Sequence, residues 1–520
     1  MSAKLLKSTA VVGVMTLLSR VLGLLRDMVF ANVFGAGSGT DAFFVAFKIP
    51  NFLRRLFAEG AFSQAFVPVL AEVRTQRGLA EVRLLVADVS GALGAVLLLL
   101  TALALLAAPG LVTLFAPGFL DEPAKFALTS EMLRITFPYL LFISLTALAG
   151  GILNTYGRFA VPAFTPVWLN LCMIAAAWWA APLFETPIVA LAWGVFAAGA
   201  VQLAFQLPFL ARLGLLPRPR WGWHDPDVKR ILKLMLPAIF GSSVVQINLL
   251  LDTIIASFLV SGSVSWLYYS DRLVEFPLGV FGIALATVIL PSLSNKHAAA
   301  DPDAFARTLD WALRWVVLIG TAATVGLILL AGPLLTTLFQ HGEFGPHDVR
   351  MATLSLMAFG IGLPAFILVK VLAPGFYARQ DTRTPVRIGI YAMVANMALN
   401  LGLVVPMVLA GWEGPHAGLA LATSLSAWLN AGLLFRHLRR DGVYHAQPGW
   451  GRLLGQVSTA AVAMGLLLWW GLGDMGQWLA MNTAQRAGQL LLWVPVGAAA
   501  YFAALLALGV RPRQLLGRGQ

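Results

Sequence analysis

Long apolar runs recur along this chain from residue 8 to residue 509, and they constrain its fold more than any other feature. The run at 89–109, for example, contains no charged residue. A helix that crosses the hydrocarbon core of a bilayer needs about 20 apolar residues. Of all residues 59% are hydrophobic and 12% are charged, against about 25% charged residues in an ordinary soluble domain. The sequence therefore predicts an all-α polytopic membrane protein.

Glycine, proline and charged clusters divide the apolar runs into fourteen predicted transmembrane helices. Their expected ranges are 8–33, 41–71, 84–108, 132–156, 162–182, 187–211, 231–259, 264–293, 310–331, 350–377, 385–410, 416–438, 453–473 and 486–509. Most of the 36 lysine and arginine residues lie in alternate connections and at both termini. Because cytoplasmic loops collect basic residues, both termini are predicted to face the cytoplasm. The net charge of +12 then reflects topology and anionic lipid, and a nucleic-acid partner is not expected.

Charged residues also occur inside the predicted spans, where each costs at least about 2.5 to 3.5 kcal/mol on insertion scales. At this cost they are expected to line a wet cavity. Basic residues outnumber acidic ones in this set, which comprises Arg20, Arg26, Lys48, Arg54, Arg55, Arg134, Arg272 and Lys370 with Asp27, Asp41, Glu59, Asp252, Asp271 and Glu275.

The second span carries a predicted charged stripe. Asp41, Lys48 and Arg55 are spaced by seven residues, so they share one face of a regular helix, and Glu59 lies one turn beyond Arg55. In the first span, Arg20 and Asp27 are also seven residues apart. In the eighth, Asp271, Arg272 and Glu275 cluster before Pro277. We expect these three helices to converge on one polar site.

Two interpretations of these charges remain open. They could be internal ion pairs that hold helices together, such as Arg26 with Asp27 or Arg272 with Glu275. The surplus of cations favours a binding site, because Glu59 cannot neutralise both neighbouring arginines, Arg54 and Arg55. The guanidinium group binds phosphate or carboxylate bidentately and stays charged in a low dielectric, so the expected ligand is an anion.

Oxygen-bearing side chains form a second candidate site. Asn396 and Asn400 lie one turn apart in one predicted span, and Asp252 and Thr423 are expected at comparable depth in two others. They could coordinate a cation through oxygen, although hydrogen bonding between helices is the commoner use of such residues. The sequence contains no phosphate-binding loop, no His-Glu-x-x-His and no Gly-x-Ser-x-Gly. We therefore expect a carrier driven by gradients rather than an enzyme, and no cofactor other than a coupling Na⁺ or H⁺.

Proline residues recur at matching positions in the two halves of the chain, as in carriers with duplicated halves. Pro68 and Pro291 end corresponding spans 223 positions apart, and Pro138 and Pro364 are 226 positions apart. This predicts an N-terminal lobe of six helices at 1–225, a C-terminal lobe of six at 226–445, and two further helices with a cytoplasmic tail at 446–520.

Three long segments carry a resemblance to a known family. They are SRVLGLLRD at 19–27, TDAFFVAFKIPNFLRRLFAEGAF at 40–62 and YYSDRLVEFPLG at 268–279. They resemble the MurJ (MviN) family of lipid II flippases, and the resemblance extends over essentially the full length. It implies the multidrug/oligosaccharidyl-lipid/polysaccharide exporter fold, which has two six-helix lobes plus two further C-terminal helices, in the inner membrane of a bacterium.

The resemblance also implies roles for particular residues. A central cavity would bind the headgroup, and its matching positions are Arg20, Arg26, Asp27, Asp41, Arg54, Arg55, Arg272 and Glu275. An apolar groove at 453–473 and 486–509 would hold the polyprenyl tail. Asp252, Asn396, Asn400 and Thr423 resemble a sodium site of some family members, although Asn400 lacks the charge of a carboxylate. Membrane lipids and the cell-wall synthesis machinery are the other implied partners.

The resulting hypothesis is outward flipping of lipid II, an undecaprenyl pyrophosphate bearing a disaccharide pentapeptide, by alternating access. The pyrophosphate would bind Arg26, Arg55 and Arg272, with Arg20 and Arg54 as capture cations and Lys48 and Asp271 nearby. Asp27, Asp41 and Glu275 would hold the arginines between cycles, because an unpaired buried cation is costly. The alternatives are a flippase for another polyprenyl-linked sugar such as an O-antigen unit, a cation-coupled drug exporter, a non-transporting scaffold and an enzyme acting on lipid pyrophosphates.

Overall fold

The computed structural model describes the backbone of residues 3–510, together with their side chains outside 3–10, 57–60, 238, 240–242, 244–245 and 283. Within this part of the chain every regular element is a helix, which confirms the predicted all-helical class. Contacts between Cα atoms divide the chain into two compact units, Met1–Ser265 and Trp266–Gln520. The predicted lobe boundaries at 225 and 445 remain predictions.

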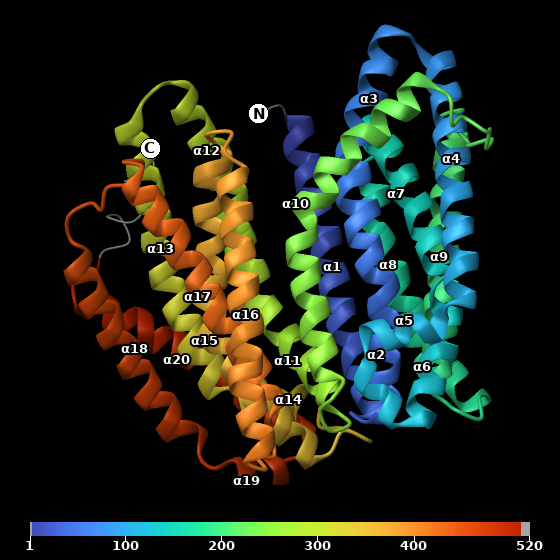
Figure 1. Ribbon diagram of the computed structural model, residues 1–520. Helices are drawn as coiled ribbons and strands as arrows, with labels where there is room; N and C mark the ends of the chain where they lie inside the picture. The colour runs from blue at the N-terminus through green and yellow to red at the C-terminus, as the bar shows by residue number, and fades with distance from the viewer. Residues whose placement is uncertain (1–2, 511–520) are drawn as a thin grey trace. The chain divides into compact units, whose positions relative to one another are not determined.

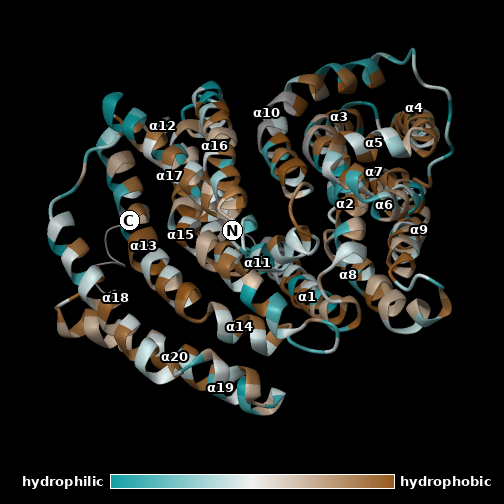
Figure 2. Cartoon of the chain, turned by 60° about the horizontal axis from the view of Figure 1, so that its bottom comes forward, coloured by the Kyte–Doolittle hydropathy of each residue, from teal (hydrophilic) through white to brown (hydrophobic). Residues whose placement is uncertain are grey.

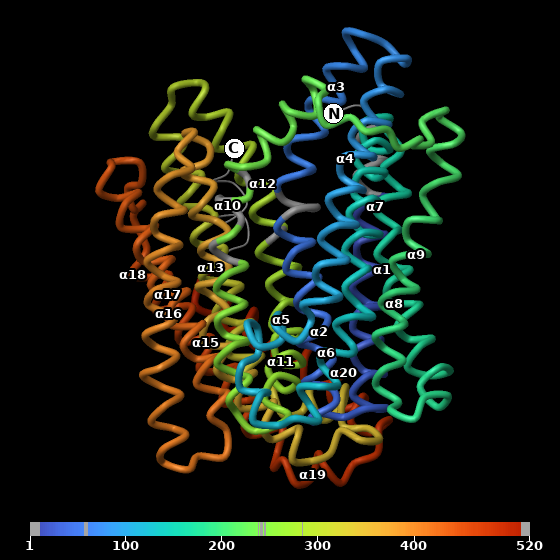
Figure 3. Tube along the Cα trace, turned by 45° about the vertical axis from the view of Figure 1, so that its right-hand side comes forward, coloured from blue at the N-terminus to red at the C-terminus, as the bar shows by residue number. Residues whose placement is uncertain are grey.

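The first unit is built from long helices with short helical segments at their ends (Figure 1). Within it α1 packs on α8, α2 on α6, and α7 on both α4 and α9, so that α4, α7 and α9 run side by side (Figure 3). The elements are α1 (Ala3–Phe34), α2 (Ser38–Leu53), η1 (Arg54–Phe62), α3 (Ser63–Gln76), α4 (Leu79–Leu106), α5 (Ala108–Phe115), η2 (Pro117–Asp121), α6 (Pro123–Thr136), α7 (Tyr139–Thr155), α8 (Ala160–Ala175), η3 (Ala176–Ala180), η4 (Ala181–Leu183), α9 (Val189–Arg212) and α10 (Pro226–Ala256).

The second unit follows the same plan and adds a C-terminal helix pair. Within it α15 packs between α13 and α17, α16 packs on α17, and α18 packs on both α13 and α20 (Figure 1). The elements are α11 (Ser263–Pro277), which begins at the unit boundary, η5 (Leu278–Gly282), α12 (Ile283–Ala298), α13 (Pro302–Leu329), α14 (Ala331–Leu338), α15 (Pro346–Tyr377), α16 (Arg383–Leu409), α17 (His416–Arg440), α18 (Trp450–Leu472), α19 (Met475–Ala480) and α20 (Thr483–Ala507).

Eleven helical segments among the described residues are long and apolar enough to cross a membrane. Hydrophobic residues cover most of the length of these helices, and hydrophilic residues gather in the connections (Figure 2). The other three predicted spans coincide with α1, with the continuous stretch α2–η1–α3, and with α10. Since α1 has 32 residues and α10 has 31, these helices also exceed the roughly 20 residues that a crossing requires.

The internal repeat that the matched prolines predict has a structural counterpart. Both α4 and α13 have 28 residues. Each is followed by a single residue, Ala107 or Leu330, that has φ of −90°. An eight-residue helix follows at once, APGLVTLF in α5 and AGPLLTTL in α14. The two pairs begin at Leu79 and Pro302, which are 223 positions apart, the same offset as Pro68 and Pro291.

Close packing of α15 on α17 requires a glycine at position 362. The Ser424 hydroxyl donates a hydrogen bond to the Ala358 carbonyl at 2.7 Å. A Cβ atom at Gly362 would lie 2.5 Å from the Ser424 Oγ and 2.8 Å from its Cα. The two helices therefore approach more closely here than any side chain on α15 would permit.

The G362A substitution is expected to destabilise the protein by about 1 to 3 kcal/mol, because the added methyl group must push backbone apart. Thermal unfolding of the purified protein measures the effect. The matched control is G402A in α16, where a Cβ atom would meet nothing within 4 Å and alanine is the better helix former. Equal unfolding temperatures for the two variants would show that the α15–α17 contact is not tight.

A buried polar network attaches the start of α18 to α13. The Asp310 Oδ1 atom accepts hydrogen bonds from the Tyr444 hydroxyl at 2.8 Å, the Gln447 N–H at 3.1 Å and the Trp450 Nε1–H at 2.7 Å. Its Oδ2 atom accepts from Arg314 Nε at 2.7 Å. Burial and the bond to Asp310 raise the pKa of Tyr444, so this hydroxyl remains a donor at neutral pH.

Replacement of Asp310 by alanine is expected to cost about 3 to 5 kcal/mol, because it leaves the buried Arg314 without its carboxylate. We expect faster amide hydrogen exchange at 441–450 and in the first turns of α18. D303A, at an exposed position in the first turn of α13, is the control and should exchange like the wild type. Unchanged protection of 441–450 in D310A would contradict this account of how α18 is anchored.

Candidate functional site

Arg26 and Asp27 form a buried ion pair in α1, as one interpretation of the sequence anticipates. Arg26 donates from Nε and Nη2 to Asp27 Oδ1 at 2.9 and 2.7 Å, and the residues are 4% and 0% exposed. Arg26 Nη1 also donates to Asn170 Oδ1 of α8 at 3.1 Å, and Asn170 Nδ2 donates to the Ser19 carbonyl at 3.0 Å. Arg26 can reach a phosphate only if Asp27 releases it.

Asp41 pairs with a lysine, whereas the sequence analysis expected it to hold an arginine. Lys125 Nζ of α6 lies 3.3 Å from Asp41 Oδ2, and both side chains are 1% exposed. The same carboxylate accepts from the Gly262 N–H at 2.7 Å and from the Ser265 N–H and Oγ–H at 2.9 and 2.6 Å. Asp41 therefore ties together α2, α6 and residues 262–265 at the end of the first unit.

The predicted stripe along the second span is interrupted by a π-helix. The regular helix α2 ends at Leu53, and η1 follows with a wider turn over Arg54–Phe62. Lys48, in the regular helix, is half-buried, whereas in η1 Arg54 is half-buried and Arg55 is exposed. Arg55 therefore does not share an environment with the buried Asp41. Arg54 Nε donates to Asn51 Oδ1 at 3.0 Å. Insertions of this kind are frequent at functional sites. The side chain of Glu59 lies outside the described residues.

The charged cluster of the second unit lies in α11. Arg272 Nη1 donates to Glu275 Oε2 at 2.8 Å, and Nη2 donates to the Tyr268 hydroxyl at 3.2 Å. The Arg272 and Glu275 side chains are 34% and 45% exposed, and Asp271 is also exposed. Unlike Arg26, Arg272 is accessible to a ligand while it remains paired. Arg20, in the first unit, is half-buried.

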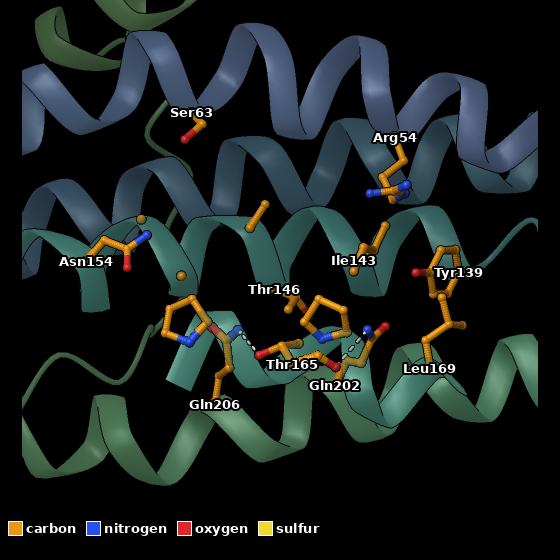
Figure 4. Close-up of a pocket in the computed structure, with 15 residues that line it drawn as sticks. Arg54, Ser63, Tyr139, Ile143, Thr146, Asn154, Thr165, Leu169, Gln202 and Gln206 are labelled. Carbon is orange, nitrogen blue, oxygen red and sulfur yellow. Dashed lines mark hydrogen bonds between the residues drawn. The ribbon is translucent and has the colours of Figure 1, made fainter. Parts of the chain in front are cut away.

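A cavity of about 520 Å³ lies within the first unit, between η1, the start of α3, α7, α8 and α9. Pockets of roughly 300 to 1,000 Å³ are typical of small-molecule sites. Arg54 and Ser63 line it from one side, and Gln202 and Gln206 from the other (Figure 4). The remaining lining residues are Tyr139, Ile143, Thr146, Ala147, Gly150, Gly151, Asn154, Pro162, Thr165, Pro166 and Leu169.

The candidate cation site is divided between the two units. Asn396 and Asn400 are fully buried in α16, and Thr423 is half-buried in α17. The Ser426 hydroxyl donates to Asn396 Oδ1 at 3.4 Å. Asp252 belongs to α10 of the first unit. The described residues contain no group of three or more histidine, cysteine, aspartate or glutamate side chains that could hold a metal ion. The sodium site remains a prediction.

Three polar features of the structure were not predicted from the sequence, namely Lys125, Asn170 and the glutamine pair of α9. Lys125 lies between two of the predicted spans, where the sequence indicates an ordinary loop charge, but in the structure it belongs to α6. The available signal for Asn170, Gln202 and Gln206 was an amide inside an apolar span, since such groups rarely face lipid.

The fold defines the class of protein. The structure superimposes on an inward-facing multidrug resistance MATE family transporter of the MOP superfamily with a TM-score of 0.64 and 14% sequence identity, over 82% of this chain and 95% of that one. It also matches the inward closed conformation of the lipid II flippase MurJ with a TM-score of 0.79 and 26% identity, over 98% and 99% of the two chains. The chain therefore has the fold of MOP-type membrane transporters.

Sequence comparison identifies the family. The model of the lipid II flippase MurJ family matches residues 30–486. A probable lipid II flippase MurJ of Vibrio cholerae is 53% identical over 99% of this chain and 98% of its own, and one of Haemophilus influenzae is 49% identical over 96% and 99%. The lipid II flippase MurJ of Burkholderia cenocepacia is 44% identical over 95% and 96%. This chain belongs to the MurJ family.

Proposed function

We propose that this protein is a lipid II flippase, which moves the undecaprenyl-pyrophosphate-linked peptidoglycan precursor from the cytoplasmic to the periplasmic leaflet of the bacterial inner membrane. The observation that carries the proposal is identity of 44 to 53% with flippases of this family over nearly the whole chain. The resemblance at 19–27, 40–62 and 268–279 pointed to the same function.

The pyrophosphate is bound by arginines that acids hold between cycles. Two pairs support this step, because Arg26 lies against Asp27 and Arg272 lies against Glu275. A phosphate oxygen can replace a carboxylate oxygen on the same guanidinium, since both accept the same fork of donors. Arg54 takes over the role first given to Arg55, because Arg54 lines the cavity of the first unit. Arg20, Lys48 and Asp271 are further candidates for contact with the headgroup.

The proposed topology has fourteen crossings with both termini in the cytoplasm. It is supported in the first unit by contacts that gather basic residues at one end of the helices. Arg77 pairs with Asp227, Arg83 Nε donates to the Gly214 carbonyl at 2.9 Å, and Arg230 pairs with Glu72. The Arg230 hydrogen bond lowers the pKa of Glu72. These contacts join the ends of α3, α4, α9 and α10, where the positive-inside rule requires the cytoplasm.

Outward flipping is expected to depend on the membrane potential, which is the proposed driving force alongside Na⁺ or H⁺. An inside-negative potential favours outward movement of a net negative charge by about 2.3 kcal/mol per charge per 100 mV. In proteoliposomes, a K⁺ diffusion potential of that size should accelerate translocation of fluorescent lipid II, and the reversed potential should slow it. Equal rates at both polarities would mean that moving arginines or counter-ions cancel the charge of the headgroup.

The proposed function is tested by translocation in proteoliposomes that contain the purified chain. We expect transfer of lipid II to the opposite leaflet at a rate well above that of protein-free vesicles. A polyprenyl-pyrophosphate carrying an O-antigen sugar unit is the matched ligand, and we expect little transfer of it. Transfer of the O-antigen lipid alone would replace the assignment with the other polyprenyl-sugar flippase, and transfer of neither would overturn it.

A further inference from the structure

We propose that the cavity of the first unit binds the uncharged polar part of the lipid II headgroup through the amide oxygens of Gln202 and Gln206. The ligand chemistry is that of hydroxyl and amide N–H donors, which the disaccharide and the peptide both carry. This inference rests on the proposed flippase function and gives one site within the headgroup a defined chemistry.

The hydrogen bonds of Thr165 fix the orientation of both glutamines. Gln202 Nε2 donates to the Thr165 carbonyl at 3.2 Å, and since a carbonyl only accepts, the nitrogen must lie on this side. The Thr165 hydroxyl donates to the Val161 carbonyl at 2.9 Å, so it can only accept from Gln206 Nε2 at 2.8 Å. Both amides therefore turn their nitrogen atoms toward α8 (Figure 4).

The oxygen end of each amide has no protein donor. Gln202 and Gln206 are 2% and 1% exposed, and among the described residues neither Oε1 atom has a hydrogen-bond partner. Buried polar atoms in native structures are nearly always satisfied by protein, water or ligand. Both residues line the cavity, so a molecule bound there can supply the missing donors. The glutamines are four residues apart on α9 and thus share one helix face.

The other polar groups of the cavity determine which ligand fits. Its lining offers amide and hydroxyl groups on Asn154, Ser63 and Tyr139, and one cation on Arg54. None of the described residues that line the cavity is acidic. The lining therefore suits a ligand with two parts. One part donates hydrogen bonds to the glutamine oxygens, and the other is a neighbouring phosphate or carboxylate that Arg54 can bind.

The test compares ligands that share the pyrophosphate and differ in what it carries. The purified full chain in nanodiscs is titrated with lipid II, with undecaprenyl pyrophosphate and with the disaccharide-bearing pyrophosphate that lacks the peptide. We expect wild type to prefer lipid II over undecaprenyl pyrophosphate. The double variant Q202L/Q206L should reduce that preference about tenfold, as the loss of two uncharged hydrogen bonds implies, and should change the affinity for undecaprenyl pyrophosphate less than twofold.

A second variant guards against misfolding of the first. In G150A, the new methyl group would lie 3.8 Å from Gln206 Oε1 and 3.5 Å from Pro162 Cβ, which are ordinary contacts, so the fold is kept while the oxygen is crowded. A several-fold loss of preference is expected. The controls are G94A, where a Cβ atom meets nothing within 4 Å, and Q340L in the second unit, where the Gln340 Oε1 is likewise buried without a partner among the described residues.

Each outcome has one meaning. If the glutamine-dependent gain in affinity over undecaprenyl pyrophosphate persists without the peptide, the cavity binds the sugar. If the gain is lost with the peptide, the cavity binds the peptide. Both results support the inference. An unchanged preference in folded Q202L/Q206L and G150A would overturn it, leaving water to satisfy the glutamines. Equal weakening of all three ligands would also overturn it, because the glutamines would then be structural. Wild type that binds none of the ligands would overturn the flippase assignment itself.

Discussion

Replacement of Asp41 by asparagine is expected to lower the stability of this protein by about 3 to 5 kcal/mol, the usual cost of removing one partner of a buried ion pair. Lys125 would keep its charge at 1% exposure without the Asp41 carboxylate. Its remaining partners would be the Ser261 hydroxyl at 2.8 Å, the partly exposed Glu122 at 3.4 Å and the Phe119 ring, whose centroid lies 4.3 Å away. Thermal unfolding of the detergent-solubilised protein measures the loss.

A double variant tests whether charge is the cause of this loss, and a substitution in another ion pair serves as the control. D41N combined with K125M removes both charges, and because no buried charge is then left unpaired, it should recover much of the stability. E72Q, in the partly exposed pair of Glu72 with Arg230, is the control and should change little. If D41N unfolds at the wild-type temperature, the network does not hold α2, α6 and the start of α11 together.

Replacement of Arg272 by alanine is expected to reduce lipid II translocation by about 10- to 100-fold, which corresponds to the loss of one charge-assisted contact with phosphate. Stability should change by less than about 0.5 kcal/mol, because the Arg272–Glu275 pair is substantially exposed. A loss of translocation without a loss of stability would show that Arg272 acts in binding rather than in folding. A substitution of Arg26 could not separate the two effects, because Arg26 is buried in an ion pair.

Arg230 provides the matched comparison for Arg272. Its guanidinium lies 2.9 Å from Glu72, against 2.8 Å between Arg272 and Glu275, so R230A also removes an arginine from a partly exposed pair. R230A should translocate lipid II at the wild-type rate. Similar losses in R230A and R272A would indicate that any arginine near the membrane surface has this effect, and the specific role of Arg272 would be wrong.

The features that local sequence could predict are those whose causes are local. The helices follow from runs of apolar residues, and the pairs Arg26–Asp27 and Arg272–Glu275 follow from partners that are one and three positions apart. The pairing of Asp41 with Lys125 joins residues 84 positions apart, and the contact of Arg26 with Asn170 joins residues 144 apart. A single sequence can mark Asn170 as a polar residue within an apolar span, but it does not show which distant residue such a side chain contacts.

Departures from regular helix geometry explain the other differences. The seven-residue spacing of Lys48 and Arg55 predicts a shared face only if the helix stays regular, and the π-helix at Arg54–Phe62 removes that condition. The cavity of the first unit was missed for a different reason. Its defining groups are uncharged glutamines, which in an apolar span indicate hydrogen bonding between helices as readily as a ligand site.

The account is tested most directly by replacing the native flippase of a depletion strain with this chain and measuring lipid II accessible on the outer leaflet. We expect wild type and R230A to restore outer-leaflet lipid II, and an equally expressed R272A to fail. Failure of wild type at normal expression would contradict the flippase assignment. Full restoration by R272A would leave the flippase assignment intact and would contradict the proposal that this arginine binds the pyrophosphate.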